Sequence, residues 1–484
     1  MFRLIVTKEL KEILSSTKFA TTFGVCSVLI LLAFFLGARG YHMGRAQHDA
    51  AVSEARRQME GETDWLNISP TVFLPPQPLA YLAPGISNDI GRTTNVQGRG
   101  GFRSEGSRFG DEPFLALFRF VDLEFIFQVV LSLLAILFAF DAICGERERG
   151  TLRLIFSQPV PRGTYILGKI TGSLLALTIP LMIPLVAGAL IFQFMGVPMS
   201  GDDWLRLALI IFTGILFIGS ILGLSVFVSA LTRNSSTAFV LLLCLWVVGV
   251  LIVPRASVLL AARSVAVPST DALLSQRSLL WAQLWRDDQN EINRFMREQM
   301  SMPDGDMDPA AQQAAMQNSV AAFNQRFDDL AEERTRKIGA LEARLNEDRA
   351  NRQRWQQRLA LGLSRISPAS TFSLATAQLA GTSLDLPDDY RNAVRAYQEQ
   401  YAAFQQEKTG RSSGGVRMVV KMSNGEDEEP PSALNLSEMP AFQWNAPPLQ
   451  QVIRAGIFDI SLLALFNVLF FAGAFVAFLR YDVR

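Results

Sequence analysis

The stretch from Asp141 to Lys169 reads DAICGERERGTLRLIFSQPVPRGTYILGK, a short, basic, glycine-punctuated segment between two long apolar runs. Residues 125–140 carry no charge, and residues 170–194 are apolar through two prolines. A helix needs about 20 apolar residues to cross the hydrocarbon core of a bilayer, so each flank is long enough to span a membrane. The sequence therefore predicts that residues 144–169 form a loop held at a membrane surface.

The composition agrees with a membrane protein. Hydrophobic residues make up 49% of the 484 residues and charged residues only 19%, which is too apolar for a soluble chain of this length. The formal net charge is zero, so no basic field indicates a nucleic-acid partner. None of the three cysteines lies in the long polar regions, which excludes a disulfide framework there.

Six runs are long enough to span the bilayer. The predicted spans are residues 19–38, 123–143, 170–194, 207–231, 236–253 and 457–479. The first span is expected to be retained, because residues 37–40 make a poor signal cleavage site.

The distribution of Lys and Arg predicts the orientation of the spans. These residues concentrate before the first span, in the connection 144–169 and after the last span, whereas the connection 196–204 carries two aspartates and no Lys or Arg. Cytoplasmic loops carry the excess of positive charge, and an even number of spans places both termini on one side. We therefore expect a multi-pass protein of the bacterial cytoplasmic (inner) membrane with both termini in the cytoplasm.

Two polar regions are then placed outside the cytoplasm. Residues 39–122 are rich in Pro and Gly and show little sign of regular structure. Residues 254–455 carry apolar stripes of helical period, which predict a long helical hairpin with its turn at residues 302–305 and a further helix over residues 387–406. A loop is expected at residues 424–431.

No catalytic constellation stands out. Residues 163–169 have the spacing of a phosphate-binding loop, but Ile170 stands where a magnesium-binding Ser or Thr belongs. Residues 412–415 resemble an ATPase signature only superficially, and the metalloprotease and nucleophile-elbow motifs are absent. The sequence thus predicts a non-catalytic chain without a cofactor or metal ion of its own.

The methionines near residue 300 leave an alternative open. Met296, Met300, Met302, Met307 and Met316 lie on the predicted hairpin. Thioethers suit Cu(I), but methionines along a helical hairpin more often provide flexible packing, and packing is the interpretation we favour. His42 and His48 are more simply read as exposed histidines after a span than as copper ligands.

Small residues and prolines within the spans indicate where helices pack. A small-xxx-small pattern on one side of the fourth span allows close approach of another helix, and prolines are expected to kink the third span. The residues assigned to helix packing are Gly219, Gly223, Ser225, Ser229, Pro180 and Pro184. No span carries an acidic relay, which disfavours a proton- or sodium-coupled transporter.

The opening segment resembles the cytoplasmic coupling segment of the ABC-2 superfamily of ABC transporter permeases. The resemblance rests on residues 146–152, on 158–162, on 168–169 and on the amphipathic start, which suits an interfacial helix over residues 1–18. Residues 367–369 and 379–382 are similar to the subgroup described as permeases involved in multicopper enzyme maturation. The coupling residues so identified are Glu146, Arg147, Glu148, Arg149, Gly150, Thr151, Leu152, Arg153, Pro159 and Arg162.

The resemblance implies an all-α integral membrane protein with six transmembrane helices, an N-terminal interfacial helix and a large, mainly helical extracytoplasmic domain between spans 5 and 6. It implies a permease subunit of the exporter type. The implied partners are a separate ATPase that binds ATP and Mg, a second permease subunit, identical or homologous, and the lipid bilayer. A short helix from about Glu146 to Phe156 is expected to dock on the ATPase. The alternative is a membrane-anchored scaffold that relays motion to a periplasmic protein without transporting a solute.

Overall fold

The computed structural model describes residues 1–65, 67–96, 104–106, 122–299, 309–409 and 434–480. The described residues divide into two compact units, one formed by residues 1–253 and 365–484 and the other by residues 254–364. The predicted turn at 302–305, the loop at 424–431, the ATPase-like residues 412–415 and much of the glycine-rich stretch near residue 100 lie outside the described residues.

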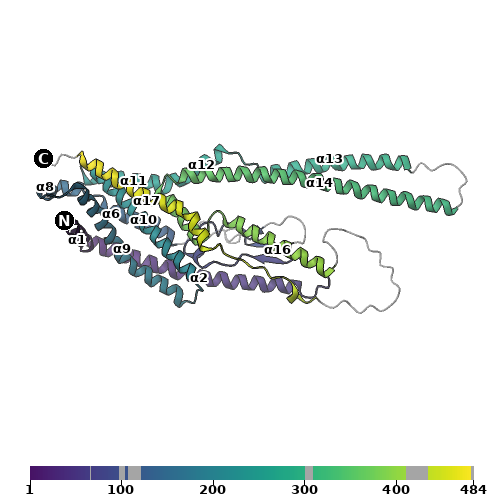
Figure 1. Ribbon diagram of the computed structural model, residues 1–484, viewed down its shortest axis with the longest axis horizontal. Helices are drawn as coiled ribbons and strands as arrows, with labels where there is room; N and C mark the ends of the chain where they lie inside the picture. Colours follow the sequence, from purple (N-terminus) through teal and green to yellow (C-terminus); the bar gives the residue numbers. More distant parts are fainter. Residues whose placement is uncertain (66, 97–103, 107–121, 300–308, 410–433, 481–484) are drawn as a thin grey trace. The chain divides into compact units, whose positions relative to one another are not determined.

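Among the described residues, six helices are long and apolar enough to cross a membrane, which confirms the predicted number of spans and the all-α membrane fold. They are Thr17–Met59, Leu123–Glu148, Arg162–Phe194, Gly201–Leu231, Ser235–Ser264 and Leu449–Leu479. Segment by segment, these helices consist of α2 (Thr17–Met59), α5 (Leu123–Phe125), η2 (Ile126–Leu131), α6 (Ser132–Ala139), α9 (Arg162–Phe194), α10 (Gly201–Leu231), α11 (Ser235–Trp246), η3 (Val247–Ile252), α12 (Val253–Ser264) and α17 (Leu449–Leu479). Figure 1 labels α2, α6, α9, α10, α11, α12 and α17.

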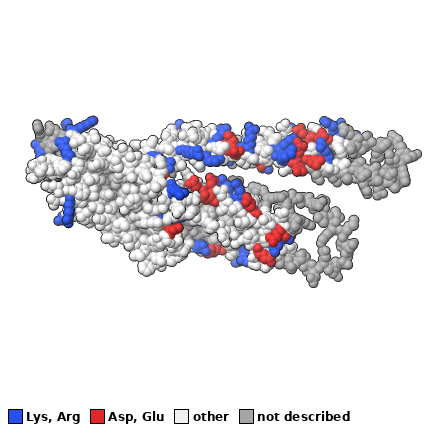
Figure 2. All heavy atoms as spheres, in the orientation of Figure 1, with Lys and Arg blue, Asp and Glu red and all other residues white. Residues whose placement is uncertain are grey.

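Short helices gather at one end of this bundle. They are α1 (Phe2–Leu14), α7 (Cys144–Glu148) and α8 (Thr151–Phe156). Figure 1 shows that α1, α8 and the end of α17 lie at this same end. In Figure 2 the surface over the bundle is almost uncharged, and blue Lys and Arg side chains reappear where α1 and α8 lie.

The region 39–122, expected to be loop-rich, holds more regular structure than its sequence suggests. Helix α2 does not end near residue 38 but continues to Met59. Strands β1 (Thr71–Phe73), β2 (Thr93–Asn95) and β3 (Ser104–Glu105) then form an antiparallel sheet in the order β1-β2-β3. The short helix η1 (Pro78–Tyr81) belongs to the connection that leads from β1 to β2.

The region 254–455, expected to be one exported domain, is divided between the two units. Helices α13 (Thr270–Gln299) and α14 (Pro309–Ser364) belong to the second unit, and their mutual contacts agree with the predicted hairpin. Helix α16 (Leu386–Thr409) belongs to the first unit, where its Tyr390 and Val394 pack on the sheet residues Val72 and Val96. The two polar regions therefore share a core, which the sequence does not reveal.

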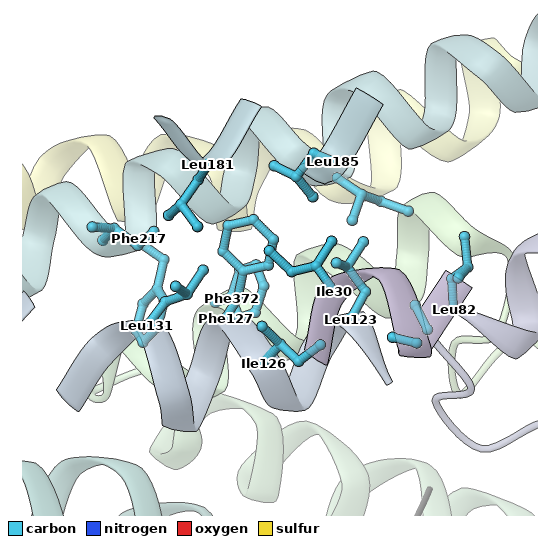
Figure 3. Close-up of a cluster of buried hydrophobic side chains, with 14 of the residues drawn as sticks. Ile30, Leu82, Leu123, Ile126, Phe127, Leu131, Leu181, Leu185, Phe217 and Phe372 are labelled. Atoms are coloured by element: carbon cyan, nitrogen blue, oxygen red, sulfur yellow. The ribbon is translucent and has the colours of Figure 1, made fainter. Parts of the chain in front are cut away.

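Helix α15 (Pro368–Ala380) departs furthest from the expected arrangement, because it is buried among the spans rather than exported. Its Phe372 is fully buried and stacks on Phe217 of α10 at a ring distance of 5.0 Å. Figure 3 shows Phe372 beside Phe127 of η2 within the main hydrophobic cluster. At 13 residues α15 is too short to span, so it forms a partial helix inside the bundle. A short 3-10 turn, η4 (Leu436–Glu438), precedes α17.

Candidate functional site

The coupling segment consists of two short helices rather than the single helix expected from Glu146 to Phe156. Helix α7 ends at Glu148, and α8 begins at Thr151. Between them Gly150 adopts a left-handed backbone with φ of 72°. A side chain at Gly150 would meet open space, so the backbone angle is what favours glycine here.

Glu146 is not part of an exposed charged rim but lies at the centre of a buried ion cluster. Its Oε1 accepts hydrogen bonds from Lys169 Nζ and from Lys8 Nζ, both at 2.7 Å. Its Oε2 accepts a hydrogen bond from the Tyr165 hydroxyl at 2.5 Å. The Glu146 side chain is only 5% exposed, so these partners replace the water that a carboxylate would otherwise require.

A second carboxylate completes this cluster, which we call the Glu146 cluster (Lys8, Glu9, Glu146, Tyr165 and Lys169). Glu9 Oε1 lies 2.6 Å from Lys169 Nζ, and the two side chains are 8% and 4% exposed. Burial raises the pKa of the Glu9 carboxyl above its ordinary value, although the neighbouring Lys169 opposes this effect. The cluster joins α1 to α7 and to the first turns of α9.

Further polar contacts attach the coupling segment to the spans. Ser229 of α10 accepts hydrogen bonds at its Oγ from the backbone nitrogens of Ile143 (3.0 Å) and Cys144 (3.2 Å). Glu148 accepts hydrogen bonds from the backbone nitrogen (2.8 Å) and the hydroxyl (2.6 Å) of Ser235, at the start of α11. Together with the bond from Lys169 of α9 to Glu146, these contacts fix the segment to helices from three different spans, α9, α10 and α11.

Helix α8 has one buried and one exposed side. Leu152 is buried, and the Phe156 ring lies 5.3 Å from that of Tyr165 and 5.4 Å from that of Phe478. Leu154, in contrast, is 71% exposed, and Arg153 beside it is exposed as well. The segment therefore presents an apolar residue and a cation to the surroundings of the bundle.

The structure separates the predicted coupling residues into two groups. Arg149, Gly150, Arg153 and Pro159 are exposed. The other residues are buried, partly buried or engaged by the bundle. Glu146 and Leu152 are buried, and Arg147 is half-buried. Glu148 is exposed but accepts hydrogen bonds from Ser235 of α11. Thr151 donates to the Glu146 carbonyl, and Arg162 donates to the Leu479 carbonyl at 2.9 Å. A docking surface on this segment thus depends on the first group and on Leu154.

Two of the residues assigned to helix packing, Gly219 and Gly223, lie where α10 and α17 meet closely. A Cβ at Gly219 would come within 2.6 Å of Asn467 Oδ1, and a Cβ at Gly223 within 3.2 Å of the Phe470 Cβ. Asn467 donates to the Leu216 carbonyl at 2.9 Å, which bonds α17 to α10. Ser225 is buried with its hydroxyl bonded inside α10, and Pro180 and Pro184 lie within the continuous helix α9.

The histidines form no ligand cluster in the part of the chain that the structure describes. His42 Nε2 lies 2.7 Å from the Met195 carbonyl oxygen, and His48 lies beside Asp49. No group of three His, Cys, Asp or Glu residues suited to a metal ion occurs among the described residues. The methionines Met300, Met302 and Met307, together with the side chain of Met316, lie outside them.

The partners of Glu146 are the functional residues that the sequence alone did not single out. From the sequence, Lys8 is only a positive charge before the first span, and Lys169 belongs to the phosphate-loop-like spacing and to the family resemblance. Neither Glu9 nor Tyr165 has a predicted role. A signal was present, because Glu9 falls on the apolar side of the amphipathic start of the chain. A buried carboxylate there requires a cation from another segment.

Comparison with known proteins agrees with this geometry. A family model described as ABC-2 family transporter protein matches residues 3–483. Two relatives, each called probable ABC transporter permease protein NosY, from Stutzerimonas stutzeri and Pseudomonas aeruginosa, are 43% identical over 61 residues, or 13% of this chain. The chain thus matches only 22% of each relative's length. The names of these relatives are consistent with the subgroup suggested by residues 367–369 and 379–382. The family model, which matches nearly the whole sequence, confirms the resemblance drawn from the coupling segment. The chain belongs to the ABC-2 family of transporter proteins.

Proposed function

We propose that this chain is the permease subunit of an ATP-driven ABC transporter and that a separate ATPase subunit docks on the exposed side of α8. The ATPase would bind ATP and Mg, and a second permease subunit, identical or homologous, would complete the pathway. Hydrolysis would then drive export of a substrate or transmit force across the membrane. The observation that carries this proposal is the contrast between a firmly anchored segment and its exposed apolar residue, Leu154.

The exposed side of α8 fits a docking surface energetically. Burial of a fully exposed Leu side chain contributes about 1.5–3 kcal/mol, so covering the 71% of Leu154 that is exposed would contribute about 1–2 kcal/mol. Arg153 beside it offers a charge that orients a partner without adding much affinity.

The anchoring explains how motion would reach the spans. The Glu146 cluster fixes α7 to α1 and α9, and Glu148 fixes it to α11. A force on α8 is therefore passed to several helices at once, since buried ion pairs and backbone hydrogen bonds resist separation.

The position of Lys169 supports the assignment of ATP to another chain. Lys169 is the lysine of the phosphate-loop-like spacing, but it lies in the regular helix α9 and binds two carboxylates. A lysine held in this way is not oriented toward a phosphate group.

The placement of charges supports the expected sidedness. The start of α1, the end of α17 and α8 lie at the end of the bundle where Lys and Arg reappear (Figure 2). This arrangement fits a cytoplasmic location for that end. The sheet and α16 would then lie outside the cytoplasm.

Substitution Leu154→Glu tests the docking surface, with Leu279→Glu as a matched control. Leu279 lies on α13 and is 70% exposed, so the two changes differ in place but not in chemistry. Affinity-tagged variants would be purified from native membranes, and the co-purified ATPase measured by its ATP hydrolysis. We expect about a tenfold loss for Leu154→Glu, from about 1.4 kcal/mol of lost apolar contact, and none for Leu279→Glu. Equal recovery of the ATPase from both variants would show that α8 is not the docking surface.

Transport itself needs a second measurement. ATP-dependent movement of a solute in proteoliposomes that contain the purified complex would distinguish a conducting permease from a scaffold that only transmits force.

A further inference from the structure

A groove of about 560 Å³ lies beside strand β1, far along the sequence from the coupling segment. We call it the β1 groove. Its walls are the part of α2 beyond residue 47, strand β1 and residues 436–444. Its volume falls within the range of about 300–1,000 Å³ that is usual for ligand sites.

The register of the sheet leaves the groove side of β1 unpaired. Leu74 N donates to the Arg92 carbonyl and Val96 N to the Pro70 carbonyl, both at 2.8 Å. The register places residues 71 and 73 opposite 95 and 93, between these hydrogen-bonded pairs. In an antiparallel ladder the N–H and C=O groups of such intervening residues point away from the paired strand.

These backbone groups of Thr71 and Phe73 have no hydrogen-bond partner among the described residues. Both residues line the β1 groove and are only partly exposed. An unpaired edge of this kind is a template for another strand. The edge is also short, because Pro70 and Pro75 bracket it.

The groove contains a further unsatisfied donor. Trp444 lines it, and the indole Nε1 is buried without an acceptor in the described part of the chain. A buried N–H without a partner costs about 1–3 kcal/mol. A backbone carbonyl of a bound segment would remove this cost once the indole turns its N–H toward the groove.

The wall formed by α2 indicates the length and the charge of the occupant. His48, Val52, Ala55, Arg56 and Met59 follow one face of the helix over 11 residues, or about 16 Å. An extended chain rises about 3.3 Å per residue, so about five residues match this wall. Arg56 is exposed and forms no ion pair with a described residue, so it offers a positive charge at the rim.

We propose that the β1 groove binds an extended segment of a partner protein, about five residues long, that adds as a strand to β1. Alternate apolar side chains of the segment lie against Val52 and Met59, and a carboxylate of the segment lies near Arg56. This inference is independent of the docking of an ATPase on α8.

The test uses the full-length protein in detergent and a fluorescein-labelled pentapeptide of alternating valine and threonine that ends in aspartate. A second peptide of the same sequence carries N-methyl groups on alternate amides, so it keeps its side chains but loses the donors that face β1. We expect the first peptide to raise the fluorescence anisotropy saturably and the second to bind at least about tenfold more weakly.

The charge is tested by Arg56→Glu, with Arg57→Glu as a matched control. Arg57 is the adjacent exposed arginine; it pairs with Glu54 and does not line the groove. Arg56→Glu should reverse the preference from the aspartate peptide to a peptide that ends in lysine, whereas Arg57→Glu should leave it unchanged. Three outcomes would each overturn the proposal. The N-methylated peptide binds as tightly as the unmodified one, Arg56→Glu and Arg57→Glu have equal effects, or no peptide binds saturably.

Discussion

Replacement of Lys169 by methionine tests whether the Glu146 cluster holds the N-terminal helix against the coupling segment. The ammonium group of Lys169 lies 2.6 Å from Glu9 and 2.7 Å from Glu146, and all three side chains are less than 10% exposed. Methionine keeps the length and apolar stem of lysine but removes its charge. Two buried carboxylates from different helices are then left facing each other without the cation between them.

The magnitude follows from the geometry. Breaking a buried ion pair by removing one partner costs about 3–5 kcal/mol. Glu146 keeps its bonds to Lys8 and Tyr165, so we expect the lower part of this range. About 3 kcal/mol corresponds to a little over a hundredfold increase in the equilibrium constant for detachment of α1.

The assay measures detachment by thiol labelling. A cysteine introduced at Ile13, which is buried on α1, reacts only when α1 leaves the bundle. We expect its labelling rate to rise about a hundredfold in the Lys169→Met background. Lys337→Met is the control, because Lys337 forms an exposed ion pair with Glu333 and its loss should not change the rate.

A neutral triple variant separates charge from packing. Glu9→Gln, Glu146→Gln and Lys169→Met together leave no buried charge in the cluster apart from Lys8, which reaches the solvent. We expect labelling of the triple variant to be slower than that of Lys169→Met alone, since replacing a whole buried ion cluster is often nearly neutral. If Lys169→Met labels at the parental rate, the cluster does not hold α1 and the reasoning is refuted.

Three shorter predictions concern other regions. Burial raises the pKa of Tyr390 to about 12, so the folded state keeps the phenol proton at a pH where the unfolded chain loses it. Folding stability should therefore fall by about 3 kcal/mol between about pH 10 and pH 12. A near-ultraviolet absorbance titration, compared with that of Tyr390→Phe, checks the raised pKa on which this loss depends. Gly219→Val should lower the free energy of unfolding by about 1–3 kcal/mol, because the added side chain overpacks the close contact with α17, and the melting temperature in detergent should fall with it. Gly24→Val, with open space around it, should leave the melting temperature unchanged. In a parent without exposed native cysteines, Ser53→Cys should react with an impermeant thiol reagent in whole cells and Ser157→Cys only after permeabilisation; the opposite pattern would reverse the topology.

The spans are predictable because a run of about 20 apolar residues identifies a membrane helix without reference to any other part of the chain. The six predicted runs all fall within the six long apolar helices, and the helix predicted over residues 387–406 is α16, Leu386–Thr409. Such elements depend on local periodicity alone. The family resemblance depended likewise on a contiguous motif.

The elements that the sequence did not predict depend on contacts between distant segments. Residues 39–59 are mainly polar, with only a few apolar residues such as Val52 and Met59 at helical spacing, but they continue a helix that the first span has already nucleated. Residues 368–380 contain no charge, yet they are too few for a span and so were assigned to the exported domain. For the site, the motif singles out residues 146–152, but the buried contacts of Glu146 depend on Lys8 and Lys169, which lie 138 and 23 residues away.

Helix α2 connects the two ends of the first unit by a single uninterrupted rod. Its 43 residues extend about 65 Å, from Thr17 beside the Glu146 cluster's helix α1 to Met59 on the wall of the β1 groove. A tilt of about 5° about one end displaces the other end by about 6 Å, more than the rise of one strand residue. A small tilt of α2 relative to β1 near residue 17 would therefore open or narrow the β1 groove by several ångströms, because the helix runs without a break between its two ends.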